Sequence, residues 1–398
     1  GGEKRLGNWL VDGHVAYTDG KERRPDEITA RFRRNTRDQT FSYSFSDPYN
    51  LSLAQLAGAT YTDPANYNFQ RVDLSNEAGD ETEVDAAIDL RLDLDTINPA
   101  YLKVGARFRS KEKSSAAEVY EFGGAPASFT FASLAGGTSN YPYLKVPQIN
   151  ADAVKQAFYS NRSGFTGERI FEDSETDDWV TNEDVTAAYA MGSVSFGATN
   201  LIAGLRVERT EFDTTGKELD LVNETTRSTT ASHSYTNWLP GLYLRHDLNS
   251  NLVLRASWSN SLARPNFGDT ANRSRINEDD GEIFIGNPAL ATLESTNWDA
   301  SVEYYLPSLG MVSASVFLKQ IDNFSYEITI PGGDPVAARG YDLTTFRNGS
   351  EGDIRGLELA YQQQLRFLPA PFDGIGVLAN ITFADSDATY PTRPGEDV

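Results

Sequence analysis

Cysteine is absent from this 398-residue sequence, and histidine occurs only three times. A chain without cysteine forms no disulfide, no thiolate metal site and no cysteine nucleophile. The histidines, His14, His233 and His246, lie far apart in the sequence and form no H-x-x-x-H motif. We therefore expect no metal site and no other cofactor.

Basic residues are also few relative to acidic ones. The 35 lysines and arginines stand against 57 aspartates and glutamates, which gives a formal net charge of -22. Nucleic-acid binding requires clustered basic side chains, so we expect no nucleic-acid partner. The sequence also lacks any apolar run of the ~18 residues that a membrane-spanning helix needs. That absence excludes a transmembrane helix, but it does not exclude transmembrane strands.

The sequence signatures of common enzymes are missing as well. No G-x-S-x-G motif, P-loop or Rossmann glycine pattern in a strand–helix context occurs. Because acidic residues are so numerous, no pair of carboxylates singles itself out for acid–base chemistry. The sequence therefore predicts a protein that is not an enzyme.

Apolar and polar residues alternate with a period of two along much of the chain. The clearest case runs from Asn297 to Ile321, where two alternating segments flank a short turn at 307–310. This pattern indicates a β-hairpin with one apolar and one polar face. Each segment has roughly the 9–11 residues that a tilted strand needs to cross a bilayer.

The alternation recurs and predicts about twelve strands. One expected strand follows the charged turn 18–25 and ends near Phe45. The others lie at 8–17, 83–95, 101–109, 185–196, 201–212, 238–248, 252–262, 297–306, 310–321, 354–367 and 376–383. Their connections alternate in length. The short turns are 18–25, 97–99, 197–200, 249–251, 307–310 and 368–375, and the long loops are 47–81, 110–182, 213–235, 263–294 and 322–353.

Short turns at one side and long loops at the other are typical of an outer-membrane barrel, with the turns in the periplasm and the loops outside. A soluble β-sandwich shows no such regularity. We therefore predict an all-β fold, an antiparallel transmembrane up-and-down β-barrel.

Five short motifs follow one another between Trp238 and Leu359. They read WLPGLYLR (238–245), NLVLRASWS (251–259) with LARPNF (262–267), GNPAL (286–290) with Glu294 and NWD (297–299), and IRGLEL (354–359). In this order they resemble the LPSLNLR, R-x-x-x-S with A-R-P-x-F, GNPxLxPE with NxD, and VxGxE segments of TonB-dependent outer-membrane receptors. The residues that carry the resemblance are Leu239, Pro240, Arg255, Arg264, Pro265, Asn287, Pro288, Asn297, Gly356 and Glu358. Proline, glycine and asparagine favour turns and strand ends, so we expect mainly structural roles for these motifs.

The resemblance implies a 22-stranded barrel with an N-terminal plug domain, which imports a scarce nutrient with energy from TonB. Residues 1–398 would be part of that single barrel domain, with about twelve of the 22 strands. The plug and the C-terminal strands are absent from this chain. The implied location is the outer membrane of a Gram-negative bacterium. The implied partners are outer-membrane lipid, a small-molecule or oligosaccharide ligand, and the TonB complex, which binds through the missing N-terminal region. The alternatives are a passive porin-like channel and a soluble β-rich carbohydrate-binding protein.

Candidate ligand-binding residues lie in two places. Arg107, Arg109 and Arg206 are expected on the polar face, where they could bind an anion or pair with nearby carboxylates such as Asp89, Asp93 and Glu208. The long loop 110–182 is rich in aromatic residues, among them Tyr141, Tyr143 and Trp179. Such rings can stack on sugars or aromatic chelates, or they can form a small core within the loop. The aromatic loop favours an oligosaccharide as ligand, followed by a ferric siderophore.

Overall fold

The computed structural model describes residues 1–34, 38–47, 50–139, 145–221, 223–277, 281–306, 309–335, 339–366 and 368–389. The chain divides into two compact units. Unit 1 comprises residues 1–20, 80–114 and 179 onward, and unit 2 comprises residues 21–79 and 115–178. Each unit is described separately below.

Seventeen of the strands in the described residues belong to one sheet. Five of them are short additions, and the remaining twelve form the main ladder, in agreement with the predicted number. In pairing order the twelve are β1 (Gly2–Leu6), β2 (Trp9–Arg33), β5 (Asn68–Leu94), β6 (Ala100–Gly123), β10 (Trp179–Phe196), β11 (Thr199–Asp220), β12 (Thr225–Asn249), β13 (Leu252–Ala263), β16 (Leu293–Leu306), β17 (Gly310–Asp322), β20 (Glu351–Gln364) and β21 (Gly376–Thr389).

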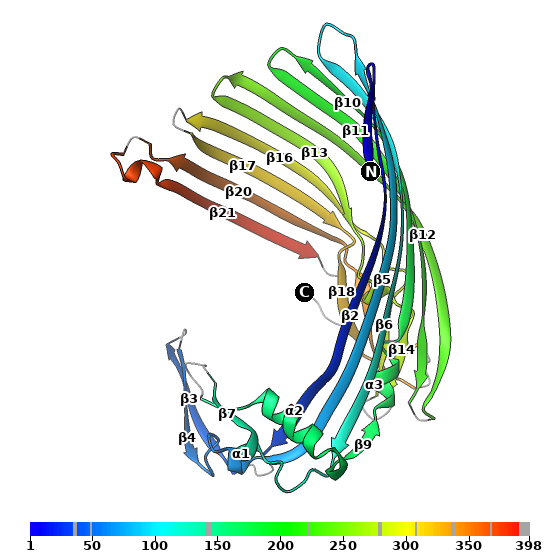
Figure 1. The fold of residues 1–398 in the computed structure, drawn as a ribbon, viewed down its shortest axis with the longest axis vertical. Coiled ribbons are helices and arrows are strands. Elements are labelled where there is room, and N and C mark those ends of the chain that lie inside the picture. Colours follow the sequence, from blue (N-terminus) through cyan, green and yellow to red (C-terminus); the bar gives the residue numbers. More distant parts are fainter. Residues whose placement is uncertain are drawn as a thin grey trace. The chain divides into compact units, whose positions relative to one another are not determined.

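Neighbours in the main ladder are connected in chain order and pair antiparallel, as an up-and-down barrel requires (Figure 1). The short turns at 197–198 and 250–251 lie where alternation predicted them. Register Phe196↔Thr199 closes the first of these hairpins, and Leu306↔Gly310 closes the hairpin of β16 and β17. The predicted antiparallel strand order is therefore confirmed.

The predicted turn at 18–25 is wrong, because β2 continues without interruption to Arg33. The charged residues that suggested a turn are paired with the neighbouring strand. Arg23 Nη1 donates a hydrogen bond to the carbonyl of Gly79 at 2.9 Å, and Arg24 Nη1 lies 3.3 Å from Glu77 Oε2. Asp26 adopts a left-handed φ of 56°, and its N–H donates to the side chain of Asn76 at 3.0 Å. The strand β2 therefore continues through the left-handed conformation of Asp26.

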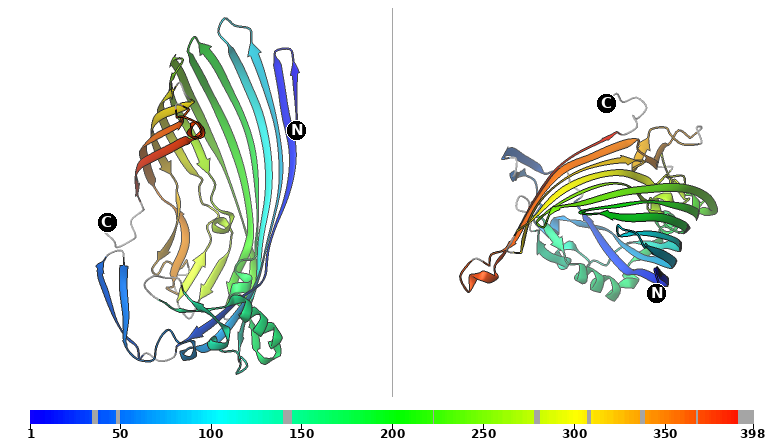
Figure 2. Two further views of the ribbon diagram at one scale, coloured as in Figure 1. Left: turned by 60° about the vertical axis from the view of Figure 1, so that its left-hand side comes forward. Right: turned by 90° about the horizontal axis from the view of Figure 1, so that it is seen from above.

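The predicted strand that ends near Phe45 is also replaced by other elements. Thr40–Asp47 (β3) and Asn50–Ala57 (β4) form a separate two-stranded hairpin, which Figure 2 shows in blue. The predicted loop 213–235 is wrong as well, since β11 extends to Asp220 and β12 starts at Thr225. This segment is rich in threonine, a β-branched residue that favours strands without apolar alternation.

The remaining elements are short, and all but η3, which lies in the predicted short turn 368–375, lie in the predicted long loops. In unit 2 they are η1 (Pro64–Asn66), α1 (Phe131–Leu134), β7 (Ala135–Thr138), β8 (Pro147–Ile149), α2 (Ala151–Ser160), η2 (Arg162–Gly164), β9 (Thr166–Arg169) and α3 (Phe171–Glu175). In unit 1 they are α4 (Phe267–Thr270), β14 (Ser274–Asn277), β15 (Glu282–Ile285), β18 (Ser325–Ile330), β19 (Asp342–Asn348) and η3 (Phe372–Gly374). Within the described ranges, no helix is both long and apolar enough to cross a membrane.

The two faces of the main ladder differ sharply in exposure. On the apolar face, Ile88 is 50% exposed and Val316 is 52% exposed. On the polar face, Asp85 and Glu183 are only 6% and 5% exposed. This is the reverse of a soluble sheet, which buries its apolar side chains and leaves charged ones in water.

Unit 2 has a hydrophobic core of its own. The core is built by side chains from the strands β2, β5 and β6 and from the segment that follows β6. Its buried residues are Val72, Leu74, Phe122, Phe129, Leu134, Val154, Phe158 and Phe165. The rings meet mostly edge to face, for example Phe129 against Phe165 at 5.1 Å between centroids, which is a favourable aromatic geometry. Among the described aromatic residues of this loop, Phe122, Phe129, Phe158 and Phe165 therefore pack into a core, as in the second of the two predicted alternatives.

Candidate functional site on the polar face of the sheet

A chain of ion pairs crosses the polar face of unit 1. Arg109 Nη2 in β6 donates to Glu183 Oε1 in β10 at 2.5 Å. Arg264, just after β13, lies 3.5 Å from Glu183 through its Nε and donates from Nη2 to Glu208 Oε2 in β11 at 2.6 Å. Arg206 Nε donates to the other oxygen of Glu208 at 2.7 Å. Three strands and one loop thus converge on two shared carboxylates, and we call these five residues the arginine network.

The arginine network carries one more positive than negative charge. Its carboxylates are nearly buried, with side-chain exposures of 6% for Glu183 and 11% for Glu208. Buried carboxylates are strongly destabilising unless they are paired and hydrogen-bonded. The buried Nε atoms of Arg109 and Arg264 have no hydrogen-bond partner in the described part of the chain. The network therefore neutralises the two nearly buried carboxylates and joins β6, β10 and β11 to the segment after β13.

A second cluster lies on the same face. His14 Nε2 is 2.5 Å from Asp85 Oδ1, and Arg107 Nε donates to Asp85 Oδ2 at 2.6 Å. His14 lies in β2 and Arg107 in β6, the two strands that flank β5 in the sheet. Asp85 is thus shared by side chains from both of its neighbouring strands.

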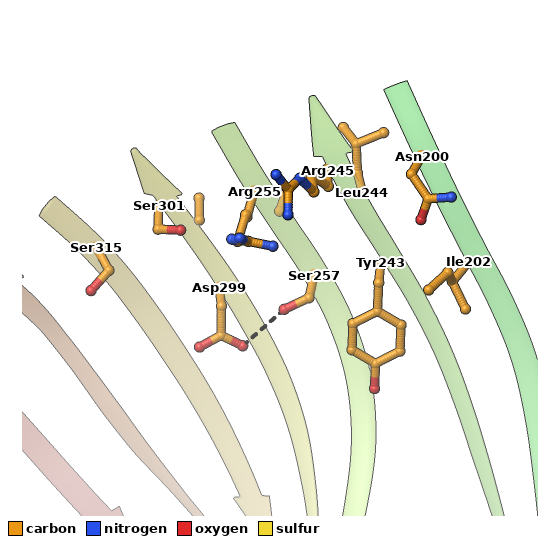
Figure 3. Close-up of a pocket in the computed structure, with 12 residues that line it drawn as sticks. Asn200, Ile202, Tyr243, Leu244, Arg245, Arg255, Ser257, Asp299, Ser301 and Ser315 are labelled. Carbon is orange, nitrogen blue, oxygen red and sulfur yellow. Dashed lines mark hydrogen bonds between the residues drawn. The ribbon is translucent and has the colours of Figure 1, made fainter. Parts of the chain in front are cut away.

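Figure 3 shows a pocket of about 380 Å³ farther along the polar face. Tyr243, Arg255 and Ser257 line it, together with Asp299 of β16 and serines of β16 and β17. Ser257 Oγ donates to Asp299 Oδ2 at 3.3 Å. Arg255 is itself paired with Glu303, with Nε 2.9 Å from Oε1. The pocket therefore presents serine hydroxyls beside the carboxylate of Asp299, and its two arginines, Arg245 and Arg255, are each paired with a carboxylate outside the lining.

The structure distributes the predicted ligand-binding residues over separate places. Arg109 and Arg206 join the same network, whereas Arg107 belongs to the Asp85 cluster. The predicted pairing of Arg206 with Glu208 is present, but Arg107 pairs with Asp85 and not with Asp89 or Asp93. Trp179 begins β10 and is only 9% exposed. Tyr141 and Tyr143 lie outside the described residues.

Several motif residues hold strands and loops together. Arg264 joins β10 and β11 through the arginine network, at the point where Pro265 ends the strand. Asn287 Nδ2 donates to the carbonyl of Phe346 at 2.9 Å, and its Oδ1 accepts from Ala289 N across Pro288. Asn297 is 7% exposed and donates to the carbonyl of Ser259 at 3.2 Å. These contacts join strands to loops within unit 1.

The other motif residues belong to paired strands. Leu239 and Pro240 of β12 are in register with Arg206 and Leu205 of β11. Glu358 Oε2 accepts from Ser315 Oγ of β17 at 3.3 Å. Gly356 is in register with Phe317, whose ring lies across it.

Sequence reasoning missed Glu183 and Asn237. Glu183 was missed because the expected strand began at 185, whereas β10 begins at Trp179. Thr181 and Glu183 are buried with the same spacing of two as Val185, but they are polar and give no apolar alternation that could have extended the predicted strand. Asn237 is 4% exposed, and its Nδ2 donates to Glu294 Oε1 at 2.6 Å. No local pattern marks this contact, because the partners are 57 positions apart.

In the described residues, no three or more His, Asp and Glu side chains are grouped so as to hold a metal ion.

The sequence matches the family described as "TonB dependent receptor-like, beta-barrel" over residues 8–398. A search of curated proteins finds no match. Among solved structures, the ferric-catecholate import receptor Fiu of E. coli K12 is similar at 11% identity with a TM-score of 0.52, and the match covers 92% of this chain and 44% of that one. FpvAI in complex with pyocin S2 is similar at 13% identity with a TM-score of 0.55, covering 98% and 39%. The chain thus spans less than half the length of either receptor.

Proposed function

The chain belongs to the TonB-dependent receptor β-barrel family, and from this premise we propose that it forms part of an outer-membrane receptor that binds a scarce extracellular nutrient for TonB-energised import. Residues 1–398 would be part of one barrel domain, because the match to the barrel family covers 8–398 and the similar receptors are more than twice as long. In this proposal the plug and the TonB contacts belong to the rest of that receptor.

The inverted exposure of the two sheet faces carries the proposal. Leu102, Trp298 and Val316 are about half exposed on one face, while Glu183 and Asp85 are nearly buried on the other. Exposed apolar side chains in this continuous pattern are stable against lipid tails and costly in water. The arrangement therefore supports a location in the outer membrane of a Gram-negative bacterium, with lipid as a partner.

Two ligand classes enter the proposal. The aromatic rings that favoured an oligosaccharide lie largely in the core of unit 2, so stacking on those rings no longer supports it. The pocket of Figure 3 supports it instead, because its serine hydroxyls and the carboxylate of Asp299 can form hydrogen bonds with the hydroxyl groups of a neutral polar ligand. A ferric siderophore is the second class. Its support is that a receptor of the same fold is described as importing ferric catecholate.

The test uses the complete product of the gene in its outer membrane. We expect a membrane band that is heat-modifiable on unboiled gels, and uptake of radiolabelled oligosaccharides or ferric siderophores that stops when TonB is deleted. A soluble product without a mobility shift would refute the membrane location. Uptake that continues without TonB and rises in proportion to ligand concentration would identify a passive channel instead.

A further inference from the structure

A polar crevice of about 450 Å³ lies at the tip of the hairpin formed by β11 and β12. The hairpin supplies most of its lining, and Ile276 of β14 and Arg339, shortly before β19, supply the rest. The polar residues that line it are Glu218, Asp220, Asn223, Thr225, Thr226, Arg227 and Arg339. No aromatic residue is among the described lining residues.

The polar groups of the crevice are held in place. Leu219, which also belongs to the lining, is fully buried between Glu218 and Asp220 in the sequence. Glu218 and Arg227 are in register across the hairpin, and Arg227 Nε donates to Glu218 Oε2 at 3.0 Å. At the turn, the backbone N–H of Asn223 donates to Asp220 Oδ1 at 3.1 Å, and its Nδ2 donates to Oδ2 at 2.8 Å. A site with fixed groups loses less conformational entropy when a ligand binds.

Arg339 is held from outside the hairpin. Its Nε and Nη2 donate to the two oxygens of Asp334 at 2.7 and 2.9 Å, and the side chain of Asp334 is completely buried. These hydrogen bonds raise the pKa of Arg339, and the charge of Glu218 raises it further. Arg339 therefore stays charged and faces the carboxylate side of the crevice.

The charges of the lining decide which ligand fits. The lining holds two carboxylates, Glu218 and Asp220, and two guanidinium groups, those of Arg227 and Arg339, of which Arg339 is already paired with Asp334 outside the lining. An anionic ligand would meet the carboxylates, and a cationic ligand would meet the guanidinium groups. A neutral hydroxyl-rich group avoids both costs, since each hydroxyl can donate to a carboxylate and accept from a guanidinium or an amide.

We propose that this crevice is a binding site for a neutral sugar ring, through which the receptor first captures an oligosaccharide. The inference rests on the proposed function and names the ligand class of that receptor. The crevice volume lies within the range of about 300–1,000 Å³ that small-molecule sites occupy. The hydroxyl-lined pocket of Figure 3 offers the same kind of groups on the polar face. A sugar can come from a free oligosaccharide or from the carbohydrate part of lipopolysaccharide, which shares this chemistry.

The experiment measures binding of the complete, detergent-purified receptor to an array of plant, fungal, bacterial and lipopolysaccharide-derived glycans. Affinities for the best glycan are then measured by calorimetry for the wild type and for Asp220→Asn and Thr226→Val. Each variant removes hydrogen-bonding capacity without adding bulk. Glu211→Gln is the control, since Glu211 lies on the same strand, pairs with Arg209 and does not line the crevice.

We expect Asp220→Asn to weaken glycan binding about ten-fold or more, because a lost hydrogen bond to a charged group has an effect of that size. Thr226→Val should weaken it by a smaller factor and Glu211→Gln not at all. A best glycan of lipopolysaccharide origin would identify the surface sugar as the source. Binding to no glycan on the array, or equal affinity in all variants, would overturn the inference. TonB-dependent uptake of a ferric siderophore that is unaffected by Asp220→Asn would leave the proposed function standing while this inference fails.

Discussion

The ring of Phe317 in β17 lies across Gly356 in β20. The two residues are in register, and a methyl group added to Gly356 would come within 2.5 Å of Phe317 Cζ. Tyr189 lies over Gly105 in the same way and donates a hydrogen bond from its hydroxyl to Asp89. Glycine provides the space that an aromatic ring needs to lie flat on a sheet. This contact gives the glycine of the IRGLEL motif a physical role.

Gly356→Ala should therefore destabilise the protein by about 1–3 kcal/mol, as overpacking of a well-packed contact does. Urea unfolding of the complete receptor in lipid vesicles, followed by tryptophan fluorescence, measures the change. Gly376→Ala in β21 is the control, since the nearest atom to an added methyl group there is 3.9 Å away. The loss should shrink when Phe317→Ala is combined with Gly356→Ala, and an undiminished loss would show that the ring is not responsible.

From the arginine network we expect Arg264→Leu to lower the free energy of unfolding by more than Gly356→Ala does. This change leaves each of two nearly buried carboxylates with one arginine of the network, Arg206 beside Glu208 and Arg109 beside Glu183. Breaking a buried ion pair costs about 3–5 kcal/mol. Because the side chains of the network keep some exposure to solvent, we expect a loss of unfolding free energy near the lower end of this range. Arg209→Gln removes an exposed pair with Glu211 and should change stability by less than about 1 kcal/mol. Equal unfolding midpoints for the two variants would contradict the assigned role of Arg264.

Because successive residues of a strand point to opposite faces, we expect an arginine to have different effects on stability at two neighbouring positions. Val316→Arg places a charge on the face proposed to contact lipid and should cost about 2–4 kcal/mol. Ser315→Arg places the same side chain on the polar face, one residue away, and should be tolerated much better. The fraction of heat-modifiable receptor in outer membranes and the unfolding midpoint both report the difference. A reversed order of the two variants would mean that the faces are assigned the wrong way round.

The hydroxyl of Tyr159 on α2 donates to Asp26 Oδ1 at 2.5 Å within unit 2. Partial burial, followed by this hydrogen bond to a carboxylate, raises the pKa of Tyr159 to about 12. Because the folded state holds the proton more tightly, the contact stabilises the protein fully below about pH 10 and is lost as the pH rises toward 12.

The measurement is the absorbance difference at the phenolate band between the wild type and Tyr159→Phe as the pH rises. Its midpoint should lie near 12, and in the background of Asp26→Asn it should move lower, because the carboxylate charge is gone while the burial remains. A midpoint near the ordinary tyrosine value of about 10 in the wild type would show that the contact does not form.

The alternation of residues determined the strand order, the antiparallel pairing and the apolar face, because a period of two is a property of each strand by itself. The motifs from Trp238 to Leu359 determined the family. Alternation did not predict where the strands end. The threonine-rich segment before Asn237 belongs to β12 although it has no apolar alternation. Charged residues of β2 form hydrogen bonds with β5 where a turn was expected.

Tertiary structure alone decided which side chains meet. The pairing of Arg264 with Glu183 and Glu208 depends on the register of strands far apart in the sequence. The burial of Phe122, Phe129 and Phe158 depends on how the loop after β6 folds onto β2 and β5, and local composition cannot distinguish such a core from an exposed stacking surface. The crevice at the β11–β12 tip likewise exists only because Arg339 approaches from more than a hundred residues later in the chain.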